Sequence, residues 1–263
     1  MDTRPIGLFD SGVGGLSILK ELIDELPNED FIYLGDTKNF PYGNKSKETI
    51  INLARKNIEF LISKNVKLII IACGTATSLA IDVVKKEYNI PIIGIIDPTI
   101  SYLKDSHKDD ETIGVIATSG TIKSGMWEKK IKDNIPNTNV INEKAPLLAI
   151  MAEEGWINNK VAEYTIKEYM KVFKNVNRLI LGCTHYPIFE KLIEKELDKN
   201  VEIINTGKII SKYVNKFLND NNINNNKKGH YLIYLTDTED NFKNIARLFL
   251  NQDIEYIIIK TGV

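Results

Sequence analysis

The chain contains two cysteines, and each of them follows an apolar run and precedes a helix-like segment. Cys73 stands in LIIIACGTATSLA (68–80), and Cys183 stands in RLILGCTHYPIFE (178–190). A single cysteine at the end of a strand is most often a small buried apolar residue. Two cysteines in matching positions, each followed within two residues by threonine, favour a chemical role for both thiols.

Ionisable side chains accompany the two thiols. His185 lies two positions after Cys183, and Asp10 ends another apolar run, so each could exchange a proton with a thiol. The N-terminus of a helix favours the thiolate. We therefore expect the helices that follow Cys73 and Cys183 to lower the pKa of both thiols.

The presence of two thiols with no metal site restricts the possible reactions. A hydrolase needs one nucleophile with a base beside it, and a redox pair is typically spaced C-x-x-C. Two thiols on opposite walls of a cleft suit the removal of a proton from one face of a carbon and its delivery to the other face, which inverts a stereocentre. The carbanion needs preorganised donors around the α-carboxylate. Hydroxyl and backbone N–H groups fit that role at Ser11, Gly43, Thr75 and Thr184.

Three other strand ends carry groups that could contact an anion. In GLFDSGVGGLS (7–17) the glycines lead into a helix start, whose free N–H groups can face an anion, but the spacing does not match the dinucleotide pattern G-x-G-x-x-G. In GDTKNFPYGNKS (35–46), Pro41-Tyr42-Gly43 is a turn whose N–H groups and tyrosine hydroxyl could hold a carboxylate, and an ordinary surface turn fits equally well. In VIATSGT (115–121), Thr118 is a further possible contact.

Short apolar runs alternate with helix-period segments along the whole chain, which predicts an α/β fold. The runs are rich in Ile, Val and Leu and do not alternate with polar residues, as is typical of parallel strands buried on both faces. The predicted strands are 6–9, 31–34, 68–72, 92–96, 113–117, 138–141, 179–181, 201–204, 231–235 and 256–259. The predicted helices include 15–25, 47–64, 75–86, 161–173, 189–197 and 241–250.

Ten strands suggest two sheets and therefore two α/β domains. Pro98 disfavours a regular element through Asp97, so we expect a crossover there and a second crossover near Thr206. The first domain then comprises residues 1–97 and 208–263, and the second comprises 98–207. Ligands bind beyond the carboxyl ends of parallel strands, where both cysteines lie, so we expect a shared cleft between the domains.

Composition excludes several classes of function. The net charge is −1, from 34 basic and 35 acidic residues, and no basic stripe or polybasic block indicates nucleic acid or a membrane surface. The first residues do not resemble a secretory signal, and no apolar run approaches the roughly 20 residues that cross a bilayer. We therefore expect a cytoplasmic protein with reduced thiols. Two cysteines and three scattered histidines predict no metal site.

Four segments resemble, in order, the motifs of the glutamate racemases, within the aspartate/glutamate racemase family: FDSGVGGLS, YLGDTKNFPYG, IACGTATS and LGCTHYPI. The resemblance runs from Ile6 to about Thr206. It implies a cofactor-independent enzyme that supplies D-glutamate for peptidoglycan, with two α/β domains, both termini in one domain, the active site between the domains, and a homodimer. It also implies that Cys73 and Cys183 are the acid/base residues and that Asp10 and His185 tune them.

The resemblance also assigns residues to the glutamate site. Glu153 is similar to a family carboxylate near the second cysteine, with the adjacent Glu154 as an alternative. Together with the turn and strand-end residues, the expected substrate contacts are Asp10, Ser11, Pro41, Tyr42, Gly43, Gly74, Thr75, Thr118, Glu153, Thr184 and His185.

Gly74 departs from the family pattern, which usually reads Cys-Asn-Thr. Glycine offers only a backbone N–H and free space, so we expect the loss of one side-chain hydrogen bond to the substrate, about 1 kcal/mol or more. On this interpretation, Gly74→Asn should improve the KM for glutamate.

Three alternatives remain open at this point. The first is a racemase for another acidic amino acid such as aspartate. The second is a Cys–His hydrolase built on Cys183 and His185 alone, and the third is a two-lobed amino-acid-binding protein without enzymatic activity.

Overall fold

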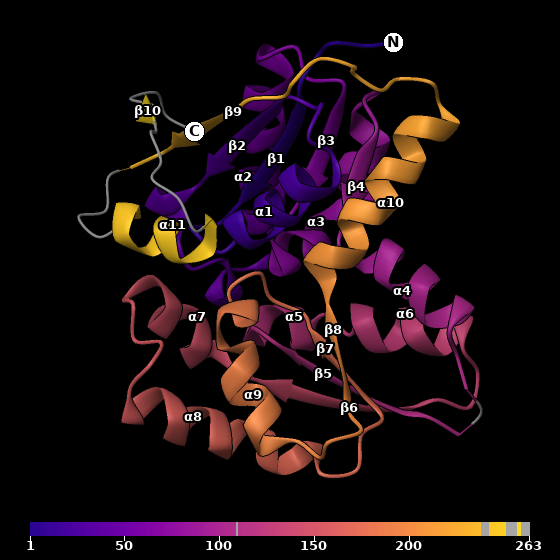
Figure 1. Cartoon of the computed structure of the whole chain (residues 1–263), viewed down its shortest axis with the longest axis vertical. Helices are drawn as coiled ribbons and strands as arrows, with labels where there is room; N and C mark the ends of the chain where they lie inside the picture. Colours follow the sequence, from indigo (N-terminus) through magenta and orange to yellow (C-terminus); the bar gives the residue numbers. More distant parts are fainter. Residues whose placement is uncertain (109, 238–241, 251–256, 259–263) are drawn as a thin grey trace.

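The computed structural model describes residues 1–108, 110–237, 242–250 and 257–258, which form two parallel β-sheets with helices packed around them (Figure 1). The first sheet has the strand order β10-β9-β2-β1-β3-β4, and the second has the order β6-β5-β7-β8. All the pairings between neighbouring strands are parallel. The prediction of an α/β fold with parallel sheets is confirmed. The strands are β1 (Ile6–Asp10), β2 (Phe31–Gly35), β3 (Leu68–Ile71), β4 (Ile92–Gly94), β5 (Thr112–Ala117), β6 (Asn139–Lys144), β7 (Arg178–Leu181), β8 (Glu202–Asn205), β9 (Tyr231–Leu235) and β10 (Ile257–Ile258).

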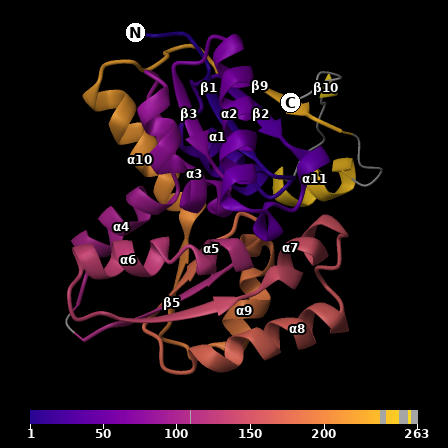
Figure 2. The same cartoon turned by 180° about the vertical axis from the view of Figure 1, so that it is seen from behind.

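Helices cover both faces of the first sheet, because its strands bury alternate residues in opposite directions. Leu68 and Ile70 of β3 pack into the core with α1 and α10, whereas Ile69 and Ile71 pack into the core with α2 and α3. Figure 2 shows the molecule from the side of α2 and α3. The α-helices are α1 (Leu16–Glu25), α2 (Lys47–Ser63), α3 (Gly74–Glu87), α4 (Ile96–Asp105), α5 (Ser119–Lys123), α6 (Met126–Asn134), α7 (Pro146–Glu153), α8 (Lys160–Met170), α9 (Glu190–Glu196), α10 (Thr206–Asp220) and α11 (Phe242–Leu250), and the short 3-10 helices are η1 (Thr37–Asn39), η2 (Tyr42–Asn44), η3 (Lys171–Phe173) and η4 (Tyr186–Phe189).

Each of the ten predicted strands overlaps an observed strand, although the predicted strand 92–96 is too long, because β4 ends at Gly94 and α4 begins at Ile96. The described part of the predicted strand 256–259 is 257–258, and residue 241 of the predicted helix 241–250 also lies outside the described residues. Five observed helices lie outside the helix ranges given above, namely α4, α5, α6, α7 and α10. The expectation that Pro98 prevents a regular element through Asp97 was wrong, because α4 begins at Ile96. Pro98 lies in the first turn of this helix, where a backbone N–H has no intrahelical acceptor and proline is tolerated.

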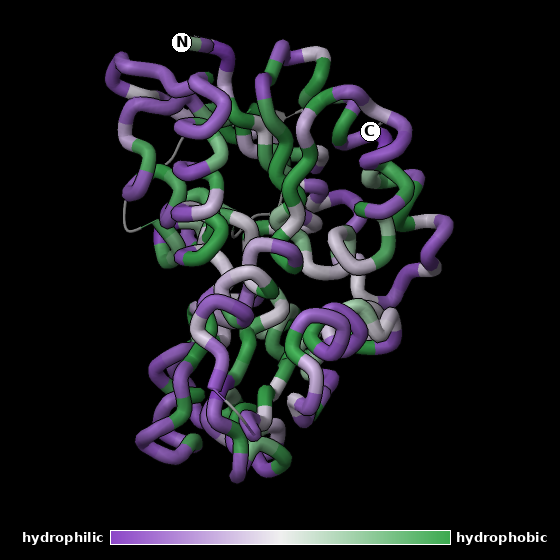
Figure 3. The backbone as a smooth tube through the Cα atoms, turned by 90° about the vertical axis from the view of Figure 1, so that its right-hand side faces the viewer, coloured by the Kyte–Doolittle hydropathy of each residue, from purple (hydrophilic) through white to green (hydrophobic). Residues whose placement is uncertain are grey.

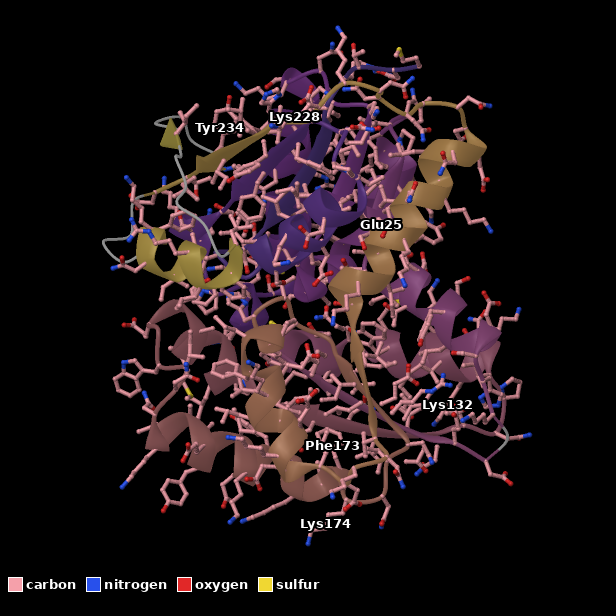
Figure 4. The ribbon with its side chains drawn as sticks, in the orientation of Figure 1. Glu25, Lys132, Phe173, Lys174, Lys228 and Tyr234 are labelled. Carbon is pink, nitrogen blue, oxygen red and sulfur yellow. The ribbon has the colours of Figure 1, made fainter. Side chains whose placement is uncertain are left out.

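The burial of side chains follows the hydropathy of the sequence. In Figure 3 the apolar segments lie inside both halves of the molecule and the polar segments lie at the periphery. Phe173 is fully buried, whereas the adjacent Lys174 is exposed and extends from the edge of the molecule (Figure 4). Among the described residues, none of the helices is both long enough and apolar enough to span a bilayer.

A buried ion pair connects Lys67, directly before β3, to Glu29, two residues before β2. The ammonium of Lys67 lies 2.6 Å from a carboxylate oxygen of Glu29, and both side chains are at most 3% exposed. The same ammonium donates to the backbone carbonyls of Asp2 and Ile223 at 2.9 and 2.7 Å. The pair thereby holds the N-terminal segment and the loop after α10 against the first sheet.

Candidate active site

Both cysteines line one small cavity between the two sheets. Cys73 follows β3 of the first sheet and Cys183 follows β7 of the second, and their side chains are 5% and 6% exposed. The lining residues are Ser11, Phe40, Pro41, Tyr42, Gly43, Cys73, Gly74, Thr75, Thr118, Ala149, Cys183, Thr184 and His185. The cavity holds about 20 Å³, which is room for about one water molecule. A larger ligand can therefore enter only after the two walls have moved apart.

Cys183 lies at one end of a chain of three side chains. Its sulfur lies 3.6 Å from Nδ1 of His185, whose Nε2 lies 2.6 Å from Oε1 of Glu153. Burial lowers the pKa of His185, but the hydrogen bonds to Cys183 and Glu153 outweigh burial and raise it well above the ordinary value. The His185 ring therefore lies between the Cys183 sulfur and the Glu153 carboxylate.

The environment of Cys73 is different. Cys73 caps the N-terminus of α3, and its sulfur lies 3.8 Å from the Ser11 hydroxyl. Burial raises the pKa of the Cys73 thiol well above its ordinary value, and the charge of Asp10 raises it further, whereas a backbone hydrogen bond from Ala76 lowers it. The prediction that a helix start lowers the pKa of this thiol was wrong, because desolvation by burial dominates.

Asp10 and Glu153 lie behind the cavity wall, and neither lines the cavity itself. Asp10 is fully buried and accepts a hydrogen bond from the Thr184 hydroxyl at 3.0 Å. Burial raises the pKa of Asp10 to about 6, and the positive charge of His185 opposes this rise. Asp10 therefore contacts the lining residue Thr184, and Glu153 contacts the lining residue His185.

Hydrogen bonds join the two sides of the cavity at several points. The hydroxyls of Thr75 and Thr118 lie 2.8 Å apart, and Ser17 donates to the carbonyl of Thr184 at 2.8 Å. The backbone N–H of Val13 donates to the same Glu153 oxygen that contacts His185, at 2.9 Å. Opening of the cavity would break these bonds and free the threonine hydroxyls to contact a substrate.

Glycines allow the two walls to approach this closely. A β-carbon built on Gly74 would lie 2.2 Å from the carbonyl oxygen of Gly182, on the opposite wall, and one built on Gly120 would lie 2.8 Å from the carbonyl oxygen of Gly43. The expectation that Gly74 leaves free space was therefore wrong for the closed cavity. The absent side chain allows backbone of the two walls to meet.

The hydroxyl of Tyr42 does not face the cavity as an anion donor, contrary to the expectation from the turn sequence. It donates to a carboxylate oxygen of Asp36 and accepts a hydrogen bond from Nδ2 of Asn57 at 3.0 Å. Burial, followed by the charge of Asp36, raises the pKa of Tyr42 well above its ordinary value, so the hydroxyl keeps its proton. Tyr42 therefore lines the cavity while its hydroxyl is bonded to Asp36 and Asn57.

Two lining residues, Phe40 and Ala149, were not predicted. The Phe40 ring lies 5.6 Å from the His185 ring, between centroids, and precedes the cis bond to Pro41. Phe40 could have been predicted from its position directly before the Pro-Tyr-Gly turn. Ala149 lies on α7, and nothing in the sequence around it distinguishes a cavity-lining alanine from a core alanine.

The chain matches known proteins over nearly its whole length. The family model described as Asp/Glu/Hydantoin racemase matches residues 16–214. A glutamate racemase of Persephonella marina is 40% identical over 251 residues, which cover 95% of this chain and 94% of the relative, and one of Lactococcus lactis subsp. cremoris is 38% identical over 254 residues, which cover 95% and 93%. The crystal structure of glutamate racemase from Francisella tularensis in complex with D-glutamate has a TM-score of 0.91 and 39% identity, and the match covers 100% of this chain and 98% of the other.

Proposed function

The chain belongs to the Asp/Glu/Hydantoin racemase family, and we propose that it interconverts L-glutamate and D-glutamate by moving protons between the substrate Cα and two thiols, Cys73 and Cys183. The observation that carries the proposal is the position of both cysteines on one cavity, each at the carboxyl end of a strand from a different sheet. Relatives of 38–40% identity that are named glutamate racemases support the choice of substrate.

The proposed reaction has two proton transfers. One thiolate takes the α-proton from one face of Cα, the electron pair remains on the substrate as a carbanion, and the opposite thiol donates its proton to the other face. The product has the opposite configuration, and the protonation states of the two sulfurs are exchanged. The reverse direction uses the same two groups in swapped roles, which explains why two thiols are needed.

The surrounding groups fit this reaction. His185, held by Glu153, is placed to exchange a proton with Cys183. Burial raises the pKa of the Cys73 thiol, and the ammonium group of a bound amino acid would bring a positive charge that favours the thiolate there. Donors at Ser11, Gly43, Thr75 and Thr184 would hold the α-carboxylate, on which the carbanion charge is delocalised. We propose no cofactor for the reaction.

We also propose that residues 1–97 and 208–263 form one domain and residues 98–207 the other. Support comes from the sheets, because β1–β4, β9 and β10 belong to one sheet and β5–β8 belong to the other. The proposed boundaries fall in α4 and α10, which connect the two sheets along the chain. Since the cavity has room for only about one water molecule, glutamate would enter after a relative movement of the two domains.

The proposed setting is the cytoplasm, where the enzyme would act as a homodimer and supply D-glutamate for peptidoglycan. The two free cysteines support a reducing compartment, and the family resemblance supports the homodimer and the pathway. Light scattering of the purified protein tests the dimer, for which a mass of twice 29.8 kDa is expected.

A racemisation assay tests the proposed activity. The purified protein, without added pyridoxal phosphate, is incubated separately with L-glutamate, D-glutamate, L-aspartate and D-aspartate, and the ellipticity of the amino acid is followed by circular dichroism. We expect both glutamate samples to reach the same racemic end point, with much slower change for aspartate. Faster turnover of aspartate would refute the proposed substrate, and no turnover of either would refute the proposed reaction.

A further inference from the structure

A buried carboxylate, Asp36, lies directly behind the loop that supplies Pro41, Tyr42 and Gly43 to the cavity. We call residues 37–45 the substrate loop. Asp36 is fully buried at the end of β2 and is not a lining residue. Its carboxylate accepts hydrogen bonds from the hydroxyl of Tyr42, from Nδ2 of Asn39 at 3.0 Å, and from the hydroxyl of Thr236 at 2.9 Å. Two of these donors belong to the substrate loop, and the third comes from the other end of the chain.

Thr236 directly follows β9, which pairs with β2 in the first sheet (Figure 1). Besides donating to Asp36, its hydroxyl accepts from the backbone N–H of Lys38 at 3.1 Å. The next residue continues the contact, because the Thr37 hydroxyl donates to the carbonyl of Asp237 at 2.8 Å and accepts from its N–H at 3.0 Å. Four hydrogen bonds therefore connect this strand end to Asp36 and to the first turn of the substrate loop.

We propose that Thr236 and Asp36 are positioning residues, which set the place of Tyr42 and Gly43 in the substrate site without touching the substrate. Asp36 joins Thr236 to Tyr42 through a single carboxylate, so a change at Thr236 reaches the cavity wall through two hydrogen bonds. The remaining partner of Tyr42, Nδ2 of Asn57, holds the hydroxyl from the α2 side but gives no connection to β9. The expected change in KM rests on the proposed function, whereas the expected effect on the position of the substrate loop does not.

The test uses Thr236→Val, which keeps the shape of the side chain and removes both the donor and the acceptor. We expect the KM for both glutamate enantiomers to rise by about five- to tenfold, which corresponds to about one lost hydrogen bond. Thr236→Ser keeps the hydroxyl and should restore KM to near the wild-type value. A matched control is Thr99→Val, at a fully buried threonine of α4 whose hydroxyl donates to the Ile95 carbonyl at 2.7 Å. The control should lower thermal stability without changing KM.

A double-mutant cycle separates a relay through Asp36 from a general loss of stability. If Thr236 and Tyr42 act through the same carboxylate, the effects of Thr236→Val and Tyr42→Phe on KM should not be independent. The increase in KM of the double variant should be smaller, by about threefold or more, than the product of the increases in the two single variants. Strictly multiplicative effects would overturn the relay.

Hydrogen exchange gives a readout that does not depend on the reaction. Amides of residues 37–45 should exchange faster in Thr236→Val than in the wild type or in Thr99→Val, with no substrate present. If the wild type failed to racemise glutamate, the proposed function would fall, and the exchange result alone would decide this inference. Unchanged exchange in the substrate loop would overturn it, as would an unchanged KM in an active enzyme. If Thr236→Val does not fold, Thr236→Ala carries the same test.

Discussion

Adding a side chain at Gly74 should oppose closure of the cavity. A β-carbon at this position would lie 2.2 Å from the Gly182 carbonyl oxygen, whereas real β-carbons keep at least 3.0 Å from such atoms. The two walls would have to move apart by about 0.8 Å, the difference between these distances. Both atoms in the contact belong to backbone or are fixed to it, so rotation of a side chain cannot relieve the clash.

The size of the effect follows from the cost of overpacking. Inserting a methyl group where there is no room typically costs about 1–3 kcal/mol. Here the cost applies to the closed form alone, because the contact is lost when the walls separate. The ratio of the closed to the open form should therefore fall by about five- to 150-fold. Because the closed cavity has room for only about one water molecule, glutamate binds the open form, and KM should fall by up to a similar factor. The free energy of unfolding should fall by no more than about 1–3 kcal/mol, the same cost of overpacking, since the open form is unaffected.

The assay compares Gly74→Ala with Gly74→Asn. Because the clash arises at the β-carbon, both variants should lower the KM for L- and D-glutamate. The missing-contact interpretation predicts a different pattern, in which Asn lowers KM and Ala leaves it unchanged. A KM in Gly74→Ala at or above the wild-type value would refute the steric reasoning.

Three further predictions concern buried charges. Glu153→Gln removes the carboxylate 2.6 Å from His185, so the pKa of the imidazole should fall by about one unit or more in an NMR titration, and an unchanged titration would contradict the assigned pairing. Asp10 has a folded pKa of about 6 against an ordinary 3.8, so its burial favours the folded state only when the carboxyl is protonated, and this contribution is lost as pH rises through about 6. The free energy of unfolding of Asp10→Asn, relative to wild type, should therefore rise by up to about 3 kcal/mol from pH 4 to pH 7.5 in urea denaturation, although the turnover of this variant should fall. A difference from wild type that is equal at both pH values would contradict this prediction. Lys67→Met leaves the Glu29 carboxylate buried without its cation and should cost about 3–5 kcal/mol, much of which should return when Glu29→Leu is added, whereas wild-type stability in the single variant would show the pair to be dispensable.

The sequence was most informative where a local pattern determines the structure. The apolar runs of β3 and β7 are short and unbroken, so they specified parallel strands buried on both faces, and their carboxyl ends specified where Cys73 and Cys183 would lie. Helices such as α5 and α7 are short, at five and eight residues, and neither shows an amphipathic pattern, because α5 (SGTIK) has one apolar side chain and α7 (PLLAIMAE) is apolar at every position except the last. Their stability depends on packing against distant segments, which local propensity does not report.

Properties that depend on desolvation or on distant partners could not be derived from the chain alone. The pKa of the Cys73 thiol follows from its burial and from the charge of Asp10, and both oppose the effect of the helix start that the sequence makes visible. The roles of Asp36 and Thr236 depend on a hydrogen bond between residues 200 positions apart. The clash at Gly74 likewise depends on the Gly182 carbonyl, which reaches it only when the two walls meet.

The account depends on proton transfer by both thiols, and exchange of the substrate α-proton in D2O tests this most directly. The wild type should incorporate deuterium at Cα starting from either glutamate enantiomer. Cys73→Ser and Cys183→Ser should each lower the rate of racemisation by at least about a hundredfold, because each removes one of the two acid/base groups. A wild-type rate of racemisation in either variant would contradict the proposed roles of the two cysteines.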